Sequence, residues 1–214
     1  HQKLRHNRER KSMEIGKVPE IVLKRSVFQQ MHTRREEVLV GAGIGEDCAV
    51  VQLAPDEVFV LSTDPITGTE KDMGKLAMQI TANDLASAGA EPVGVLLTVL
   101  LPPSSEEALI RKLSEEVDHA CKELGMQVMG GHTEVTAVVN QPLLSVTGVG
   151  KVKKGALVTT GGAQVGDDVV VSKWIGIEGT SIIAKEKEEE LLSRFSRPFL
   201  HEAKDFDKFL SVVP

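Results

Sequence analysis

The chain has 214 residues, a net charge of −6 and 41% hydrophobic residues, but only 3% aromatic residues and no tyrosine. Its length allows one large domain or two small ones, and its composition is that of a globular protein. The acidic balance and the scarcity of aromatic side chains argue against a nucleic-acid-binding protein. No apolar run is long enough to span a membrane, and the two cysteines fit a reducing compartment. We therefore expect a cytoplasmic protein with no membrane partner.

Hydrophobic periodicity and turn residues predict the elements of the first 155 residues. In chain order these are a helix, two strands, a helix, a strand, a helix and two strands, over 18–31, 48–53, 57–63, 72–88, 92–101, 104–124, 126–136 and 141–152. Asp72 is expected to cap the second helix and Gly89 to end it. Ser104 and Glu107 form the S-x-x-E pattern of a capping box, and Gly125 is expected to end that helix.

Strands and helices are mixed without strict β-α-β alternation, which favours an α+β fold over 13–155. The glycine pair at 130–131 is expected to form a turn after a short strand. Beyond a boundary near 155–165, we expect one strand followed by helices, over 168–174, 176–195 and 199–214. These elements are too few to bury an α/β core, so the segment 160–214 is interpreted as a truncated second domain.

Residues 1–12 (HQKLRHNRERKS) form a basic stretch with five Lys or Arg and one Glu. Met13 follows this stretch and resembles a natural start. We therefore interpret 1–12 as a tail or an upstream extension, with a functional basic arm as the alternative.

The stretch VLVGAGIGEDCAVV is similar to the glycine turn that seats a dinucleotide. The fingerprint G-x-G-x-x-G/A fails, because its last position is Glu46 when read from Gly41 and Cys48 when read from Gly43. The residues that follow predict two strands with no crossover helix, which rejects a Rossmann dehydrogenase. Glu46 and Asp47 instead suggest a site where Mg²⁺ lies between carboxylates and phosphate oxygens, with an ordinary turn as the alternative.

Three further polar clusters lie near the ends of predicted elements. Asp64 precedes a proline and is also a common residue to start a turn. Asn83 and Asp84 lie deep in a helix of Leu, Ala and Ile, where a buried carboxylate is unfavourable unless it is paired or binds a metal. His132 and Glu134 follow a glycine pair, and a lone histidine is more often structural than a ligand. Each cluster alone has a structural explanation, but together they suggest oxygen ligands for Mg²⁺ and a triphosphate.

The segments GIGEDCAVV, LSTDPITGT, ANDLASAGAEP and GGHTEVT, in this order and spacing, resemble the superfamily of aminoimidazole ribonucleotide synthetase. This PurM-like superfamily includes thiamine-monophosphate kinase, selenophosphate synthetase and the hydrogenase maturation protein HypE. The opening IGKVPEIVLKRSVF, together with STDPITG and GGHTEVT, looks closest to the HypE-like branch. The resemblance runs from about Lys17 to the end of the chain.

The resemblance implies an α+β, PurM-like N-terminal domain over 13–155, with a mixed sheet and helices, that binds ATP and dimerises. Two copies of such a domain pair their sheets into a β-barrel, and ATP binds near the dimer interface. A partial α/β C-terminal domain would follow over 160–214. Members of the superfamily use ATP to phosphorylate an oxygen, often an amide-type carbonyl oxygen, which then leaves as phosphate.

Site residues follow from the same motifs, with ATP and Mg²⁺ as cofactors. The expected metal ligands are Glu46, Asp47, Asp64 and Asp84. The expected ATP and phosphate contacts are Gly43, Gly45, Asn83, Gly130, Gly131, His132 and Thr133. Backbone N–H groups at glycines supply donors for phosphate oxygens. Two positions depart from the family pattern: Glu46 replaces a common Asp, and His132 replaces the Asp of thiamine-phosphate kinases and typical HypE. A catalytic side chain is not assigned.

We therefore expect an ATP- and Mg²⁺-dependent enzyme of the HypE-like branch that activates a carbonyl oxygen by phosphorylation. Its expected partners are a small-molecule or carboxamide-type substrate, a second copy of the chain and a maturation protein. One alternative is another activity of the superfamily, either a cyclo-ligase or a small-molecule kinase. A further alternative is a non-catalytic module that binds nucleotide or dimerises.

Overall fold

The computed structural model describes residues 13–44, 50–66, 71–159, 161 and 163–213, so the predicted tail over 1–12 lies outside the described residues. The strands are β1 Gly16–Lys17, β2 Val38–Val40, β3 Val50–Val51, β4 Glu57–Ile66, β5 Glu91–Leu101, β6 Gln127–Val135 and β7 Leu143–Lys153. The helices are α1 Glu20–Ser26, α2 Met73–Ser87, α3 Glu107–Leu124, α4 Ile177–Glu186, α5 Glu188–Leu191 and α6 Arg197–Lys204, with short 3-10 helices η1 Phe28–Gln30, η2 Lys154–Ala156 and η4 Asp205–Phe209.

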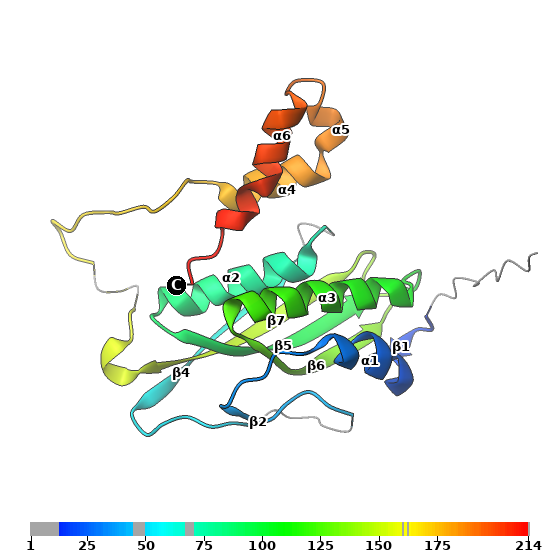
Figure 1. The fold of residues 1–214 in the computed structure, drawn as a ribbon, viewed down its shortest axis with the longest axis horizontal. Coiled ribbons are helices and arrows are strands. Elements are labelled where there is room, and N and C mark those ends of the chain that lie inside the picture. The colour runs from blue at the N-terminus through cyan, green and yellow to red at the C-terminus, as the bar shows by residue number, and fades with distance from the viewer. Residues whose placement is uncertain (1–12, 45–49, 67–70, 160, 162, 214) are drawn as a thin grey trace, which may run out of the picture.

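A five-stranded sheet in the order β1-β6-β5-β7-β4 forms the centre of the molecule, and β2 pairs with β3 in a separate hairpin. Strands β5 and β6 run parallel and are connected through α3, whereas the other neighbouring pairs in the sheet are antiparallel. Figure 1 shows α2 and α3 side by side over one face of this sheet. The mixed sheet with helices confirms the expected α+β class.

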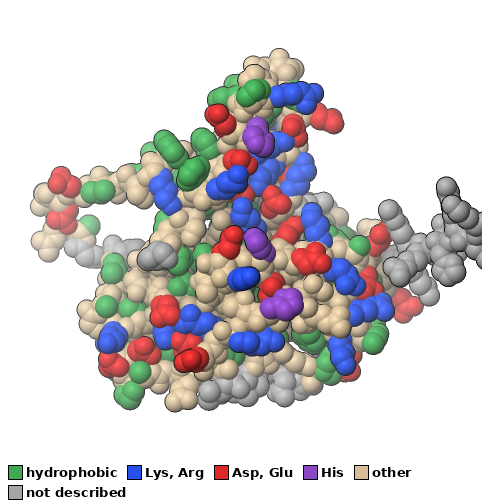
Figure 2. Space-filling view, in the orientation of Figure 1, with side chains coloured by type: hydrophobic (Ala, Val, Ile, Leu, Met, Phe, Trp, Pro, Cys, Tyr) green, Lys and Arg blue, Asp and Glu red, His purple; other side chains and the backbone are tan. Residues whose placement is uncertain are grey.

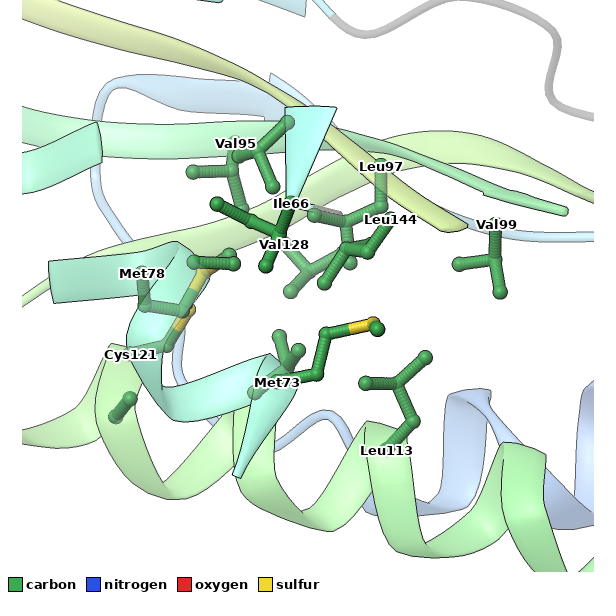
Figure 3. Packing of buried hydrophobic residues seen from close by; sticks show 14 of the residues in the cluster. Ile66, Met73, Met78, Val95, Leu97, Val99, Leu113, Cys121, Val128 and Leu144 are labelled. Atoms are coloured by element: carbon green, nitrogen blue, oxygen red, sulfur yellow. The ribbon is translucent and has the colours of Figure 1, made fainter. Parts of the chain in front are cut away.

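The hydrophobic core lies between the sheet and the two long helices. Figure 3 shows Met73 of α2 and Leu113 of α3 facing Leu97 and Leu144 of the sheet. Cys121 of α3 is fully buried, and this burial raises the pKa of its thiol to about 12. Cys121 therefore acts as a small apolar side chain of the core.

The helix predicted over 18–31 is interrupted. Pro19 stands at the N-cap of α1, and the turn at Val27 separates α1 from η1. The capping box predicted for α3 is wrong, because the helix begins after Glu106 and makes no side-chain cap. Glu107 instead receives a hydrogen bond of 2.7 Å from the Arg25 side chain, which ties α3 to α1. At the other end Gly125 has φ 65° and ends α3 as expected.

The glycine turn predicted at 130–131 is also wrong, because both glycines lie inside β6. Gly131 has φ 150°, and a Cβ atom at this position would lie 2.0 Å from the carbonyl oxygen of Leu97. The backbones of β5 and β6 thus approach each other more closely here than any side-chain-bearing residue permits. A glycine in a sequence typical of a strand can mark either a turn or a close approach of two backbones. Here it marks the close approach.

Strand β5 is a nearly continuous apolar run, but only one of its faces is covered. Val95, Leu97 and Val99 are buried under the helices, whereas Thr98 is exposed and Leu96 is 37% exposed. The reason is that α2 and α3 cover a single face of the sheet. Phe59 and Leu61 of β4 are exposed as well, so apolar side chains remain accessible on β4 and β5.

Residues 165–175 cross from the sheet domain to α4 as an extended segment without a described strand partner. The strand predicted over 168–174 is therefore wrong, since a strand needs a neighbouring edge for its backbone hydrogen bonds. Val170 is 87% exposed, and Figure 2 shows hydrophobic side chains along this segment. The helices expected after it are present as α4, α5 and α6. Whether 160–214 is a domain of its own stays a prediction.

Among the described residues, none of the helices is both long and apolar enough to cross a membrane.

Candidate functional site

A pair of carboxylates joins β4 to α2. The Ser62 hydroxyl donates a hydrogen bond of 2.7 Å to Oδ2 of Asp84 and lies 3.3 Å from Oδ2 of Asp64. Hydrogen bonding and charge from Asp84, together with partial burial, raise the pKa of Asp64. Two like charges this close repel each other unless a proton or a cation lies between them. The sequence analysis named both aspartates as candidate ligands, and the structure places their side chains next to each other.

The surroundings of this pair differ from the expectation in two ways. Asp64 and Pro65 lie inside β4, so the alternative of an ordinary turn at Asp64 is wrong. Asp84 is exposed rather than buried, because it lies near the end of α2 on a side that the core does not cover. Ser62 was missed by the sequence reasoning. The signal available for it was its spacing of two residues from Asp64, which places both side chains on the same face of a strand.

Asn83 lies next to Asp84 but faces another part of the chain. Its amide nitrogen donates a hydrogen bond of 2.8 Å to the carbonyl oxygen of Leu210. Its amide oxygen accepts a hydrogen bond of 2.8 Å from the backbone N–H of Val212. In this structure, therefore, Asn83 holds the segment that follows η4 against α2.

A cluster of charges strengthens the same contact. Asp207 of η4 accepts hydrogen bonds of 3.0 Å from Lys75 of α2 and 2.8 Å from Lys185 of α4. Burial alone would raise the pKa of Asp207, but the two lysines outweigh this effect and lower it. Gln79 of α2 donates a hydrogen bond of 3.3 Å to the Asp207 carbonyl oxygen. Helix α2 thus binds the sheet with one face and the C-terminal segment with another.

His132 and Glu134 form a pair on β6, at a distance of 2.8 Å between Nε2 and Oε2. The register pairs His132 with Thr98, which is exposed. Thr133 lies between them, and its carbonyl oxygen accepts a hydrogen bond of 3.1 Å from the backbone N–H of Val18. The motif GGHTEV is therefore part of a strand and not a loop.

The sheet separates these two parts of the predicted site. Asp64 lies on β4, whereas His132 lies on β6, and β7 and β5 stand between them. Three spacings between neighbouring strands amount to about 14 Å. One copy of the chain thus brings Asp64 and Asp84 together at one side of the sheet and keeps His132 toward the other.

The other predicted residues are only partly described. Gly45, Glu46 and Asp47 lie outside the described residues. Gly43 is half-buried and, with Gly130, lines a cavity between the sheet and α3. Within the described part of the chain, no group of three or more His, Cys, Asp or Glu side chains is placed to hold a metal ion.

A second charged network positions the start of β2, and the sequence reasoning missed it. The side chain of Arg35 donates a hydrogen bond of 2.9 Å to Glu37, which also receives one from Lys151 of β7. These bonds, the one from Arg35 foremost, lower the pKa of Glu37 to about 2 despite its partial burial. The backbone N–H of Arg35 donates a further hydrogen bond of 2.7 Å to the Gln127 side chain. The chain that leads into Gly43 is thereby attached to the sheet.

Comparison with known proteins finds relatives by sequence and by structure. Carbamoyl dehydratase HypE of Cupriavidus necator is 28% identical over 179 residues, which cover 79% of this chain and 50% of that protein. Thiamine-monophosphate kinase of Escherichia coli (strain K12) is 28% identical over 162 residues, which cover 72% of this chain and 46% of the kinase. The crystal structure of hydrogenase maturation protein HypE in complex with ATP has a TM-score of 0.67, at 19% identity over 78% of this chain and 50% of that chain, and supports the fold alone. The chain spans about half the length of the curated relatives it matches.

Residues 45–152 match the family described as AIR synthase related protein, N-terminal domain. These residues make up just over half of the 214-residue chain. They include α2, α3 and the strands that carry Asp64 and His132. The chain belongs to the AIR synthase related protein family, whose N-terminal domain it contains.

Proposed function

We propose that this chain is the nucleotide-binding part of an ATP- and Mg²⁺-dependent, HypE-like enzyme that activates a carbonyl or amide-type oxygen by phosphorylation. The observation that carries this proposal is the pair Asp64 and Asp84, held together by Ser62. The raised pKa of Asp64 means that ionising both carboxylates costs stability. Such an arrangement is typical of a site built for a ligand rather than for the fold.

The chemistry of the donors fits Mg²⁺, which prefers carboxylate oxygens and phosphate oxygens. We propose Glu46, Asp47, Asp64 and Asp84 as the residues that hold it. When bound, the metal would neutralise the charge of the ATP phosphates, which is the main requirement of phosphoryl transfer. For the phosphates themselves we propose the contacts expected from the motifs: Gly43, Gly45, Asn83, Gly130, Gly131, His132 and Thr133. For Asn83 this role requires the segment around Leu210 to leave its amide group.

A second copy of the chain would complete the proposed ATP site. Asp64 and His132 lie about 14 Å apart across the sheet. Phe59, Leu61 and Leu96 expose apolar surface on the strands, which a second sheet would cover. We therefore propose a homodimer in which 13–155 binds ATP and provides the interface, with 160–214 as part of a C-terminal domain.

The proposed substrate is a small molecule with a carboxamide-type group, and a further maturation protein is the proposed partner. The likeness to carbamoyl dehydratase HypE favours this substrate class. The similar likeness to thiamine-monophosphate kinase favours the alternative of a small-molecule kinase, and the family also leaves a cyclo-ligase activity open. A substrate-dependent release of ADP, measured with a panel of carboxamides and phosphate monoesters, separates these activities.

The experiment that tests the proposal is calorimetric titration of ATP into the chain with and without Mg²⁺. We expect saturable binding that requires Mg²⁺ and that falls at least about tenfold in Asp84→Ala. The matched control is Asp56→Ala, which removes an exposed carboxylate just before β4 and should bind as the wild type does. Binding that is equal in Asp84→Ala and wild type would contradict the proposed metal site. Binding without turnover by any substrate of the panel would favour the non-catalytic module.

A further inference from the structure

The C-terminal strap, residues 205–213, contacts α2 through Asn83. It comprises η4 and the residues that follow it, and Figure 1 shows it running from the C-terminal helices back to α2. Both polar atoms of the Asn83 side chain are engaged. Nδ2 donates to the carbonyl oxygen of Leu210, and Oδ1 accepts from the backbone N–H of Val212, each at 2.8 Å. A ligand that takes over this amide group therefore has to displace the strap.

The rest of the strap is held mainly by polar contacts. Asp207 accepts hydrogen bonds of 3.0 Å from Lys75 of α2 and 2.8 Å from Lys185 of α4. Leu210 and Val213 pack against the hydrophobic core, but both remain partly exposed. One hydrogen bond in a protein typically contributes about 0.5–1.5 kcal/mol to stability. Detachment of the strap therefore breaks a small number of weak contacts and leaves the core between the sheet and the long helices closed.

The contact between α2 and the strap is also imperfect. Gln79 of α2 is only 6% exposed, and its amide nitrogen donates a hydrogen bond of 3.3 Å to the Asp207 carbonyl oxygen. Its amide oxygen is the one buried side-chain nitrogen or oxygen atom of the described residues to which the protein offers no hydrogen-bond partner. A buried polar atom in this state lowers the stability of the contact around it. Release of the strap would expose this oxygen to solvent and remove the penalty.

We propose that the C-terminal strap is autoinhibitory and competes with the phosphates of ATP for the side chain of Asn83. The inference rests on the proposed function, because it takes Asn83 as a phosphate contact beside the metal ligand Asp84. When ATP and Mg²⁺ bind, the strap leaves α2. When the strap is attached, the affinity for ATP is reduced by the free energy needed to detach it. Because such a coupling is reciprocal, loosening the strap strengthens ATP binding.

The first test measures tryptic cleavage of the full chain after Lys204 and Lys208, with and without ATP and Mg²⁺. A ligand that binds the folded state normally slows proteolysis, because it stabilises that state. Here we expect the opposite at these two positions, with cleavage at least about threefold faster at saturating ATP and Mg²⁺. Cleavage that is unchanged or slower, at concentrations where calorimetry shows saturated binding, would overturn the proposal.

The second test loosens the strap without changing any proposed ATP contact. Asp207→Asn removes the charge that binds Lys75 and Lys185, and we expect the affinity for ATP with Mg²⁺ to rise about three- to tenfold. The matched control is Asp205→Asn. Asp205 also lies in η4 but accepts its hydrogen bond from Lys208 of the same short helix, so this variant should bind ATP as the wild type does.

A second variant covers the case in which Asp207→Asn folds poorly. The Lys173 side chain donates a hydrogen bond of 2.8 Å to the carbonyl oxygen of Phe209 and another to that of Ser211. Lys173→Met removes both bonds from the far side of the strap and should raise the affinity for ATP in the same way. Thermal unfolding identifies which of the two variants is folded.

The results separate this inference from the proposed function. ATP binding that requires Mg²⁺ and falls in Asp84→Ala, but is unchanged in Asp207→Asn and Lys173→Met, would overturn the strap and leave the proposed function standing. Mg²⁺-dependent binding that is absent in the wild type and present in the two loosened variants would support both. No ATP binding by the wild type or by either folded variant overturns both.

Discussion

The hydroxyl of Ser62 donates a hydrogen bond of 2.7 Å to the carboxylate of Asp84, and this bond joins the edge strand β4 to helix α2. It also places Asp84 beside Asp64, whose pKa is raised by the neighbouring carboxylate. A carboxyl group with a raised pKa in the folded state favours folding while it is protonated. That contribution is lost as the pH rises through the raised value.

Replacing one carboxylate should therefore stabilise the protein at neutral pH. We expect Asp84→Asn to raise the thermal midpoint by about 1–2 °C at pH 7, because the repulsion between the two groups is removed. The gain should vanish near pH 3, where Asp64 is protonated in both proteins. Thermal unfolding followed by circular dichroism at both pH values measures the difference. Asp56→Asn is the control, and a gain at pH 7 equal to that of Asp84→Asn would contradict the coupling.

Glu37 should show the opposite pH dependence. Hydrogen bonds from Arg35 and Lys151 lower the pKa of Glu37 from 4.5 to about 2, so its ionised form stabilises the folded state. Glu37→Gln should lower the free energy of unfolding by about 1–2 kcal/mol at pH 7. The difference from wild type should shrink as the pH falls from 4.5 toward 2, where the wild type loses the same charge. Urea unfolding across this pH range tests it, with exposed Glu36→Gln as the neighbour that should change little.

The glycine pair of β6 offers a matched comparison. Gly131→Ala places a Cβ atom 2.0 Å from a backbone oxygen of β5, which cannot move without disturbing the centre of the sheet. We expect a loss of at least about 2 kcal/mol in the free energy of unfolding. Gly130→Ala meets only the Leu96 side chain, at 3.2 Å, and should cost far less. Equal losses from the two substitutions, measured by denaturant unfolding, would show that the close approach of β5 and β6 is not what requires glycine.

Asn83 can be tested as the residue that holds the C-terminal segment. Asn83→Ala removes the hydrogen bonds to Leu210 and Val212 and should lower the free energy of unfolding by about 1–2 kcal/mol. Trypsin should then cleave faster after Lys204 and Lys208, because the segment is released more often. Ser87→Ala, which removes a hydrogen bond within α2 itself, is the control. Cleavage at the same rate in both variants would mean that Asn83 does not hold the segment.

Local signals were sufficient for most of the secondary structure. The apolar stripe around Leu113 and Cys121 predicted α3, and the glycine at 125 predicted its end, because both depend on residues a few positions apart. The secondary structure was predicted wrongly where one local sequence pattern is compatible with two different structures. Gly130 and Gly131 fit a turn as well as a close approach of strands, and a run of valines over 169–171 fits a strand only if an edge is available for pairing.

The sequence by itself determined the family and the α+β class and named Asp64 and Asp84 as candidate site residues, because residue types and their order suffice for these. The tertiary structure alone decided that Ser62 links this pair, that His132 lies across the sheet from it, and that Asn83 faces the C-terminal segment. It alone also formed the cavity between the sheet and α3, whose lining residues are drawn from Leu23 to Leu144 along the chain. The physical reason is that strand order and helix packing bring together residues far apart in sequence, and no periodicity within one segment encodes those distances.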